Sequence, residues 1–172
     1  IIGNSTPRYN FGLNLDAAWK GFDVKVFFQG TLKRDAMCRN SVFYGPSQSK
    51  WQAMVFKDHM DFWRPEGDPL GENLDAYYPR ADWNGGKNFQ SSSYILQDAS
   101  YVRLKNVTIG YTLPQSITRK FFVENLRVFA SGENLLTFTS FSKLSDPELV
   151  SADFGKTYPL SQTFSLGLSV TF

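Results

Sequence analysis

The sequence predicts an all-β chain whose strands have one apolar and one polar face, which is the pattern of an antiparallel transmembrane β-barrel. Three observations predict that the chain is a fragment of such a fold. Aromatic residues make up 16% of the 172 residues, yet the mean hydropathy is only −0.30. Apolar and polar residues alternate at a period of two in five segments, as they do in strands with two different faces. The connections between these segments are alternately short and long.

The first expected strand covers residues 9–19 and the second covers residues 22–33. In each, one row of alternate residues is apolar and the other is mostly polar. The apolar row of the first consists of Tyr9, Phe11, Leu13, Leu15, Ala17 and Trp19. The apolar row of the second consists of Phe22, Val24, Val26, Phe28, Gly30 and Leu32. Lys20 and Gly21 are expected to join the two strands in a tight turn.

The third expected strand, residues 101–113, is less regular. Arg103 and Lys105 are expected to face water. The same alternate row, however, also contains the apolar residues Val107, Ile109 and Tyr111. Either a β-bulge shifts the register within this strand, or its face changes character along its length.

The fourth and fifth expected strands cover residues 125–138 and 162–172. The apolar row of the fourth consists of Leu126, Val128, Ala130, Leu136 and Phe138. The fifth, which ends in FSLGLSVTF, alternates most regularly of all. Its apolar row consists of Phe164, Leu166, Leu168, Val170 and Phe172.

The connections follow the rule of bacterial barrels, which have short periplasmic turns and long extracellular loops. The short ones are Lys20–Gly21 and residues 114–123. Residues 34–100 and 139–161 are therefore expected to be extracellular loops, with the C-terminus in the periplasm. A short helix is expected in the longer loop, because a capping-box pattern beginning at Ser49 precedes an apolar-rich stretch that Pro65 ends.

Five strands do not form a closed barrel. In lipid every backbone N–H and C=O must be paired, so only closed barrels and helices span a membrane. The smallest barrels have about eight strands. If the five strands span a membrane, we expect the covalent protein to be longer than this chain.

Several function classes are excluded by composition. The net charge is +2, and without a long Lys/Arg run no nucleic-acid partner is expected. His59 is the single His and Cys38 the single Cys, which is too few for a His/Cys metal site. No Ser or Cys has a recognisable nucleophile setting. We therefore expect no enzyme activity, catalytic residue, metal or cofactor.

The second half of the chain carries specific motifs. They are YILQDASYVRLKNVTIGYTLP (Tyr94–Pro114), NLRVFASGENLLTFTSF (Asn125–Phe141), DPE (Asp146–Glu148), YP (Tyr158–Pro159) and the terminal FSLGLSVTF. In order and spacing they resemble the C-terminal end of the SusC/RagA family of TonB-linked outer-membrane transporters of the Bacteroidetes. Residues 1–93 fit this family only in strand pattern and loop alternation.

The resemblance implies that the chain supplies about five C-terminal strands of a barrel of about 22 strands with an N-terminal plug. Family members take up glycans, oligosaccharides or peptides across the bacterial outer membrane. The implied partners are a SusD-like surface lipoprotein, the outer-membrane assembly machinery and the lipid bilayer. TonB is a further implied partner, through an N-terminal region that this chain does not contain.

The terminal segment resembles the signal that the assembly machinery reads. An amphipathic strand can add to the edge of another sheet through main-chain hydrogen bonds. The residues expected to carry the signal are Phe164, Leu166, Leu168, Val170 and Phe172. Alternatively, they are only the last lipid-facing strand, and both roles are compatible.

Aromatic residues of the longer loop are candidates for contact with a ligand or with a lid protein. They are Trp51, Trp63, Tyr77, Tyr78 and Trp83. Alternatively, they pack in the loop's own small core or lie at the lipid headgroup boundary. For Asp146–Glu148, a turn-forming role is expected.

A different class remains open at this point, namely a soluble β-sandwich that binds carbohydrate. In that fold the apolar rows would be buried against a second sheet. The alternation of short and long connections, the terminal Phe172 and the length of the apolar rows favour the barrel.

Overall fold

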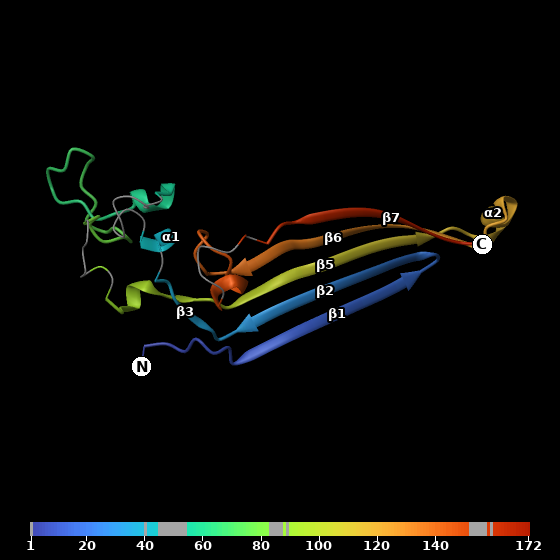
Figure 1. The fold of residues 1–172 in the computed structure, drawn as a ribbon, viewed down its shortest axis with the longest axis horizontal. Helices are drawn as coiled ribbons and strands as arrows, with labels where there is room; N and C mark the ends of the chain where they lie inside the picture. Colours follow the sequence, from blue (N-terminus) through green and yellow to red (C-terminus); the bar gives the residue numbers. More distant parts are fainter. Residues whose placement is uncertain are drawn as a thin grey trace.

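The computed structural model describes residues 2–39, 41–44, 55–82, 88, 90–151, 158 and 160–172. Its main feature is one antiparallel sheet with the strand order β1-β2-β5-β6-β7 (Figure 1). The strands are β1 (Tyr9–Trp19), β2 (Phe22–Leu32), β5 (Tyr101–Thr112), β6 (Asn125–Thr139) and β7 (Thr163–Thr171). Their bounds differ from the expected ranges by at most one residue at either end.

The connections lie at opposite ends of the sheet (Figure 1). The segments after β2 and after β6 gather at one end, which we call the loop end. It contains a two-stranded sheet of β3 (Asp35–Met37) and β4 (Leu96–Asp98). It also contains α1 (Ser41–Tyr44) and the 3₁₀ helices η2 (Lys57–Met60), η3 (Ser93–Ile95) and η5 (Pro147–Ser151). The other end, the short-turn end, has only the β1–β2 turn, α2 (Gln115–Thr118) and η4 (Arg119–Phe121).

The helix expected before Pro65 is only partly present. Within the described residues of that stretch, the structure has the single 3₁₀ turn η2. The chain beyond η2 is extended, because the Trp63 N–H donates to the Tyr78 carbonyl at 2.9 Å and the Arg64 N–H to the Asn73 carbonyl at 3.1 Å. Ser49 and the rest of the capping-box pattern lie outside the described residues.

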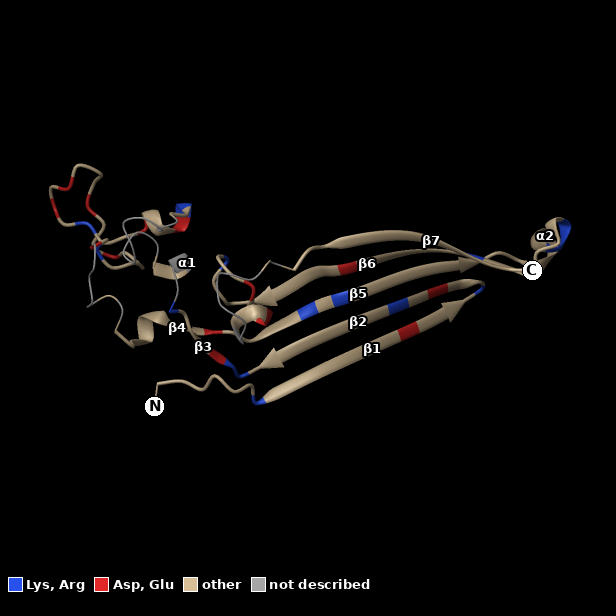
Figure 2. Cartoon of the chain, viewed as in Figure 1, with Lys and Arg blue, Asp and Glu red and all other residues tan. Residues whose placement is uncertain are grey.

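The register places the apolar rows of all five strands on one face. Leu15 is opposite Val26, Val26 is opposite Val107, and the pairing continues in this way to β7. We call this the apolar face. The other face, which we call the polar face, carries mostly Asn, Gln, Ser, Thr, Gly and charged residues. Figure 2 shows few charged positions along the strands and more of them at the loop end.

A β-bulge resolves the irregularity of the third strand. The register shifts at Lys105, so that Val102 and Leu104 lie on the apolar face together with Val107 and Ile109. Of the two alternatives read from the sequence, the bulge is confirmed. Arg103 is then on the polar face, but the expectation that it faces water is wrong, because it is only 2% exposed.

Among the described residues, the hydrophobic core cluster lies at the loop end. Its members are Ala36, Cys38, Phe43, Tyr44, Ile95, Ala99 and Phe141. By contrast, no large apolar side chain of the apolar face is buried. Among the described residues no second sheet covers that face, as a β-sandwich would require. No helix in the described ranges is long and apolar enough to cross a membrane.

The short-turn end contains a backbone conformation that is unusual for its residue. Phe122 ends η4 with φ 58° and ψ 28°, in the left-handed region. For a residue with a Cβ this conformation costs roughly 1–2 kcal/mol, and helices usually place Gly there. The Phe122 side chain is nevertheless 92% exposed.

Candidate functional site

The expected assembly-signal residues lie together at one edge of the sheet. β7 pairs with β6, and no described strand pairs with its other edge. The expected residues of β7 all belong to the apolar face and are exposed, and Phe172 follows the strand. They are Phe164, Leu166, Leu168, Val170 and Phe172. The arrangement provides an amphipathic strand with a free edge.

Three of the expected contact residues of the longer loop lie within the described residues, namely Trp63, Tyr77 and Tyr78. Trp51 and Trp83 lie outside the described residues. Tyr78 is partly buried and packs against the core at the loop end. Trp63 and Tyr77 are exposed.

Phe43 is the centre of an aromatic cluster that includes Tyr77 and Tyr78. Its ring lies 5.5 Å from that of Tyr94, 5.7 Å from that of Tyr78 and 6.4 Å from that of Tyr77, all between centroids. Burial raises the pKa of Tyr78 to about 12 and also raises the pKa of Tyr94. Their hydroxyls are therefore neutral at physiological pH.

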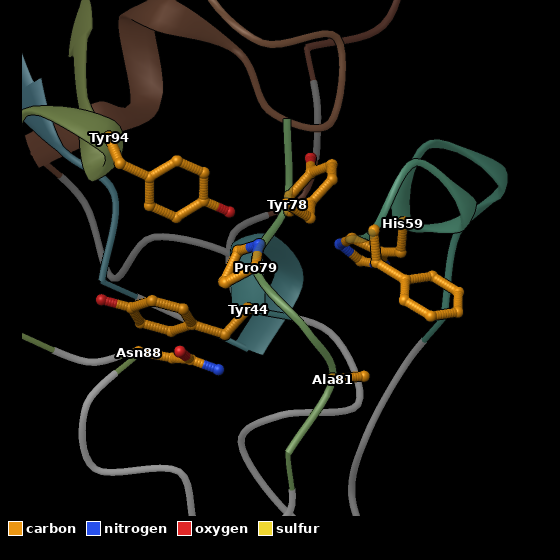
Figure 3. Close-up of a pocket in the computed structure, with 8 residues that line it drawn as sticks. Tyr44, His59, Tyr78, Pro79, Ala81, Asn88 and Tyr94 are labelled. Carbon is orange, nitrogen blue, oxygen red and sulfur yellow. The ribbon is translucent and has the colours of Figure 1, made fainter. Parts of the chain in front are cut away.

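A small cavity of about 20 Å³ lies beside this cluster, between Tyr44, Tyr78, Tyr94 and His59 (Figure 3). His59 Nδ1 accepts a hydrogen bond from the Phe56 backbone N–H at 3.0 Å, which places the proton of the neutral ring on Nε2. Within the described part of the chain, His59 Nε2 has no hydrogen-bond partner. The cavity has room for about one water molecule. The described residues that line it include no carboxylate to act with His59 as an acid–base pair.

An open groove lies next to the cluster on the surface. It has a volume of about 470 Å³, within the range of small-ligand sites. Aromatic and polar side chains line it, namely Trp63, Tyr77, Tyr78, Tyr94, Arg80, Asn88 and Ser92. Tyr77 is held in place, since its hydroxyl donates to the Tyr94 carbonyl at 3.4 Å and accepts from Gln97 Nε2 at 3.1 Å. The groove offers ring faces for stacking and side chains for hydrogen bonds.

A buried ion cluster ties the second long loop to the polar face. The Arg103 guanidinium donates to Asp146 Oδ2 and to Glu148 Oε2, each at 2.6 Å, and to Thr137 Oγ1 at 2.8 Å. Lys105 Nζ, from the bulge, lies 2.9 Å from both Glu148 oxygens. The planar guanidinium can bind two carboxylates at once, which a Lys ammonium does with less geometric precision.

The DPE motif thus has two roles. Asp146 Oδ1 accepts from the Glu148 backbone N–H at 2.8 Å at the start of η5, as a turn-forming residue does. The same carboxylates anchor η5 on Arg103, a role that we did not infer from the sequence. The signal that was present is the pair of basic residues Arg103 and Lys105 in a strand that otherwise alternates regularly.

A second ion pair crosses the polar face near the short-turn end. Asp23 of β2 and Arg127 of β6 are bidentate partners, with Nε–Oδ1 at 2.9 Å and Nη2–Oδ2 at 2.5 Å. The pair spans β5 above Gly110. A Cβ at Gly110 would lie 2.5 Å from atoms of both side chains, so the bridge requires glycine there.

Comparison with known proteins agrees with this architecture. A TonB-dependent receptor, P3, of Formosa agariphila is 31% identical over the whole chain, and another, P26, of the same organism is 29% identical. The TonB-dependent receptor SusC of Bacteroides thetaiotaomicron is 34% identical over 51% of the chain. In the open-open structure of the RagAB peptide importer, a chain matches all of this one at a TM-score of 0.74 and 26% identity. No family model matches the chain.

This chain is part of a TonB-dependent receptor of the SusC/RagA kind. It spans 17% of the length of receptor P3 and 18% of the matched RagAB chain. The five-stranded antiparallel sheet matches part of that transporter. TonB-dependent receptors sit in the outer membrane and are transporters rather than enzymes. Among the described residues of this SusC/RagA-type chain, no group of three or more His, Cys, Asp and Glu side chains is arranged to hold a metal.

Proposed function

We propose that the chain forms five transmembrane strands at the C-terminal end of a barrel of about 22 strands that imports nutrients across the outer membrane. One observation carries the proposal: five paired strands present a continuous apolar face on which no large side chain is buried. The strands have 11, 11, 12, 15 and 9 residues, enough for a tilted strand to cross a bilayer, which takes roughly 9–11.

In this proposal the apolar face contacts lipid and the polar face lines the lumen. Large aromatic side chains near both ends of the apolar face support the arrangement, because Trp and Tyr favour the membrane–water interface. Trp19, Phe22 and Tyr111 lie at the short-turn end, and Tyr9 and Phe138 at the loop end. The long loops are extracellular, and the short turns and the C-terminus are periplasmic.

Site-specific labelling of intact cells tests the orientation. Lys143 of the second long loop and Lys120 of the β5–β6 connection are both exposed and lie at opposite ends of the sheet. In the full-length receptor, a large membrane-impermeant maleimide is expected to label Lys143→Cys on intact cells. It is expected to label Lys120→Cys only after the outer membrane is permeabilised. The reverse order would overturn the orientation, and labelling of both on intact cells would overturn the transmembrane sheet.

The proposed substrate is a glycan, an oligosaccharide or a peptide. The likeness to a SusC receptor and to a peptide importer supports this range, and the aromatic groove is a candidate contact for the ligand or for a lid protein. Loss of binding or uptake in Trp63→Ala and Tyr77→Ala, with Leu70→Ala unaffected as an exposed control, would support the groove. Unchanged binding and uptake in both variants would remove it.

The proposed partners act at different parts of the receptor. A SusD-like lipoprotein covers the loop end, in keeping with the similarity to RagAB. TonB engages a part of the receptor that this chain does not contain. The assembly machinery reads β7, whose exposed apolar row supports that role. Phe164→Ser and Phe172→Ser are expected to lower the amount of heat-modifiable receptor in the outer membrane, whereas the polar-face control Ser165→Thr is not.

A further inference from the structure

The β5–β6 connection carries an exposed apolar group at the end of the sheet opposite the long loops (Figure 1). Ile117 lies in α2, and Phe121 ends η4, the 3₁₀ helix that follows α2 directly. Phe122 follows directly. All three side chains are exposed, with Phe121 at 72%. Connections between strands do not need such residues, because polar residues, Gly and Pro form turns at lower cost.

Packing within the chain does not explain Phe122. Its backbone is in the left-handed region, where Gly is the residue with the lowest conformational cost. Its ring is almost fully exposed, so it gains very little from contacts with the rest of the described chain. Backbone and side chain would therefore both favour another residue if water surrounded this turn.

The charged residues near Phe122 indicate what surrounds the β5–β6 connection. Residues 114–123 contain Arg119 and Lys120 and no acidic residue, and Lys20 lies in the neighbouring turn. Figure 2 shows basic residues on the connection that contains α2. Basic residues beside exposed aromatic rings fit the boundary of a lipid leaflet, where phosphates lie next to the acyl chains.

The position of the turn supports the same conclusion. Trp19 and Phe22 end the apolar face at the same end of the sheet, and both are exposed. The aromatic residues of the connection therefore lie at the end of the sheet where, on the proposed function, Trp19 and Phe22 contact the lipid boundary. A partner protein would have to match the basic residues while lying beside the bilayer.

We propose that residues 115–122 are a membrane-interface anchor, in which Phe121 and Phe122 enter the headgroup region and Arg119 and Lys120 bind lipid phosphates. The inference rests on the proposed function, because it requires the apolar face to contact lipid. The anchor would fix the depth of the barrel in the bilayer at the end away from the loops.

Spin labelling of the full-length receptor in nanodiscs tests the anchor. A nitroxide is attached at Phe122→Cys, at Leu168→Cys on the apolar face and at Lys143→Cys in the long loop, each with all other cysteines replaced. Collisions with oxygen, which is enriched in lipid, are compared with collisions with a water-soluble nickel chelate. The label at position 122 is expected to favour oxygen several-fold more than the label at position 143, but less than the label at position 168.

Each other outcome has a definite meaning. A label at position 122 that is as accessible to nickel as position 143, with position 168 in lipid, would overturn the anchor and leave the proposed function intact. Exclusion of both reagents from position 122 would indicate a protein contact and also overturn it. If position 168 is not in lipid, the proposed function fails, and the anchor fails with it.

The role of the basic residues is tested with lipid composition. In nanodiscs with phosphatidylglycerol, the label at position 122 is expected to lie deeper than in nanodiscs of phosphatidylcholine alone. Arg119→Gln together with Lys120→Gln is expected to remove that difference. A lipid dependence that is unchanged in the double variant would show that these two residues do not bind the phosphates.

Discussion

The loop end and the sheet use their apolar residues in opposite ways. At the loop end, Phe43 and Ile95 are 2% and 0% exposed, in a core that includes residues of both long loops. On the sheet, Leu166 is 88% exposed, in a face without any large buried side chain. The loop end therefore supplies its own apolar surroundings, whereas the sheet relies on surroundings that the described chain does not supply. Each large apolar side chain that stays in water lacks the stabilisation of about 1.5–3 kcal/mol that its burial would give.

The largest expected effect is in the core of the loop end. Phe43→Ala removes the centre of the aromatic cluster and is expected to cost about 3–5 kcal/mol of local stability. Hydrogen exchange in the full-length receptor measures this, because the Cys38 N–H donates to the Ile95 carbonyl and the Ala99 N–H donates to the Arg34 carbonyl. Both amides should exchange faster while those of β6 do not. Equal acceleration in the strands would mean that the two regions are not separate.

Arg103→Ala is expected to release η5 from the polar face. The substitution leaves Asp146 and Glu148 without their main partner, and we expect the local stability of the loop to fall by about 2–4 kcal/mol. This value is low for a buried ion pair because Glu148 is partly exposed. The amide of Leu149, which donates to the Asp146 carbonyl, should exchange faster. Arg103→Lys should recover only part of the protection, since Lys lacks the planar fork. If Arg103→Ala leaves that amide unchanged, the ion cluster does not anchor the loop.

A charge on the apolar face tests the other half of the comparison. Ile109→Arg places a guanidinium on the face that we propose contacts lipid. It is expected to cost about 2 kcal/mol, between the values for the bilayer midplane and the interface. Thr108→Arg, on the polar face of the same strand, is the matched control and should cost little. The measurement is the concentration of guanidinium chloride at which half of the receptor in lipid vesicles is unfolded. Similar losses for the two variants would argue against a lipid-facing side.

A smaller loss of stability is expected at the ion pair between Asp23 and Arg127, which spans β5. Gly110→Ala forces Asp23 and Arg127 apart and should cost about 1 kcal/mol, because a partly exposed ion pair contributes little more than that. In a background with both Asp23→Ala and Arg127→Ala, the same change should cost almost nothing. An equal loss of stability in the two backgrounds would show that the backbone at Gly110, and not the ion pair above it, disfavours a side chain there.

The smallest expected change is in chemical reactivity and leaves stability unaffected. Burial raises the pKa of Cys38 from 9.0 to about 12, which lowers the thiolate fraction at pH 8 by about 1,000-fold. A thiol reagent should therefore modify Cys38 only after denaturation. Rapid modification of the folded receptor would show that the core at the loop end opens readily.

The strands and their faces could be predicted because period-two alternation is a local property of the sequence. The bulge at Lys105 was predicted as one of two alternatives. The sequence shows that the apolar residues of this strand change from one alternate row to the other, but it does not show whether the backbone bulges at that point. The anchoring role of Arg103 was missed because its partners, Asp146 and Glu148, lie 43 and 45 residues away. Packing of Tyr77 and Tyr78 in a small core of the loop was stated as an alternative. The part that Phe43 and Tyr94 play in that core was missed, because the members come from separate parts of the loop.

The bulge also affects how this sheet can be recombined with those of its relatives. Between the same two rows of facing residues, β2 advances two residues (Val26 to Phe28), β5 three (Leu104 to Val107) and β6 four (Gly132 to Leu136). The extra residues keep the apolar face continuous only when the three strands occur together. Deletion of Lys105 alone would move one half of the apolar row of β5 to the opposite face, because side chains alternate with a period of two. The three strands are therefore matched to one another at Lys105, and a change in the number of residues in one of them needs a matching change in its neighbours.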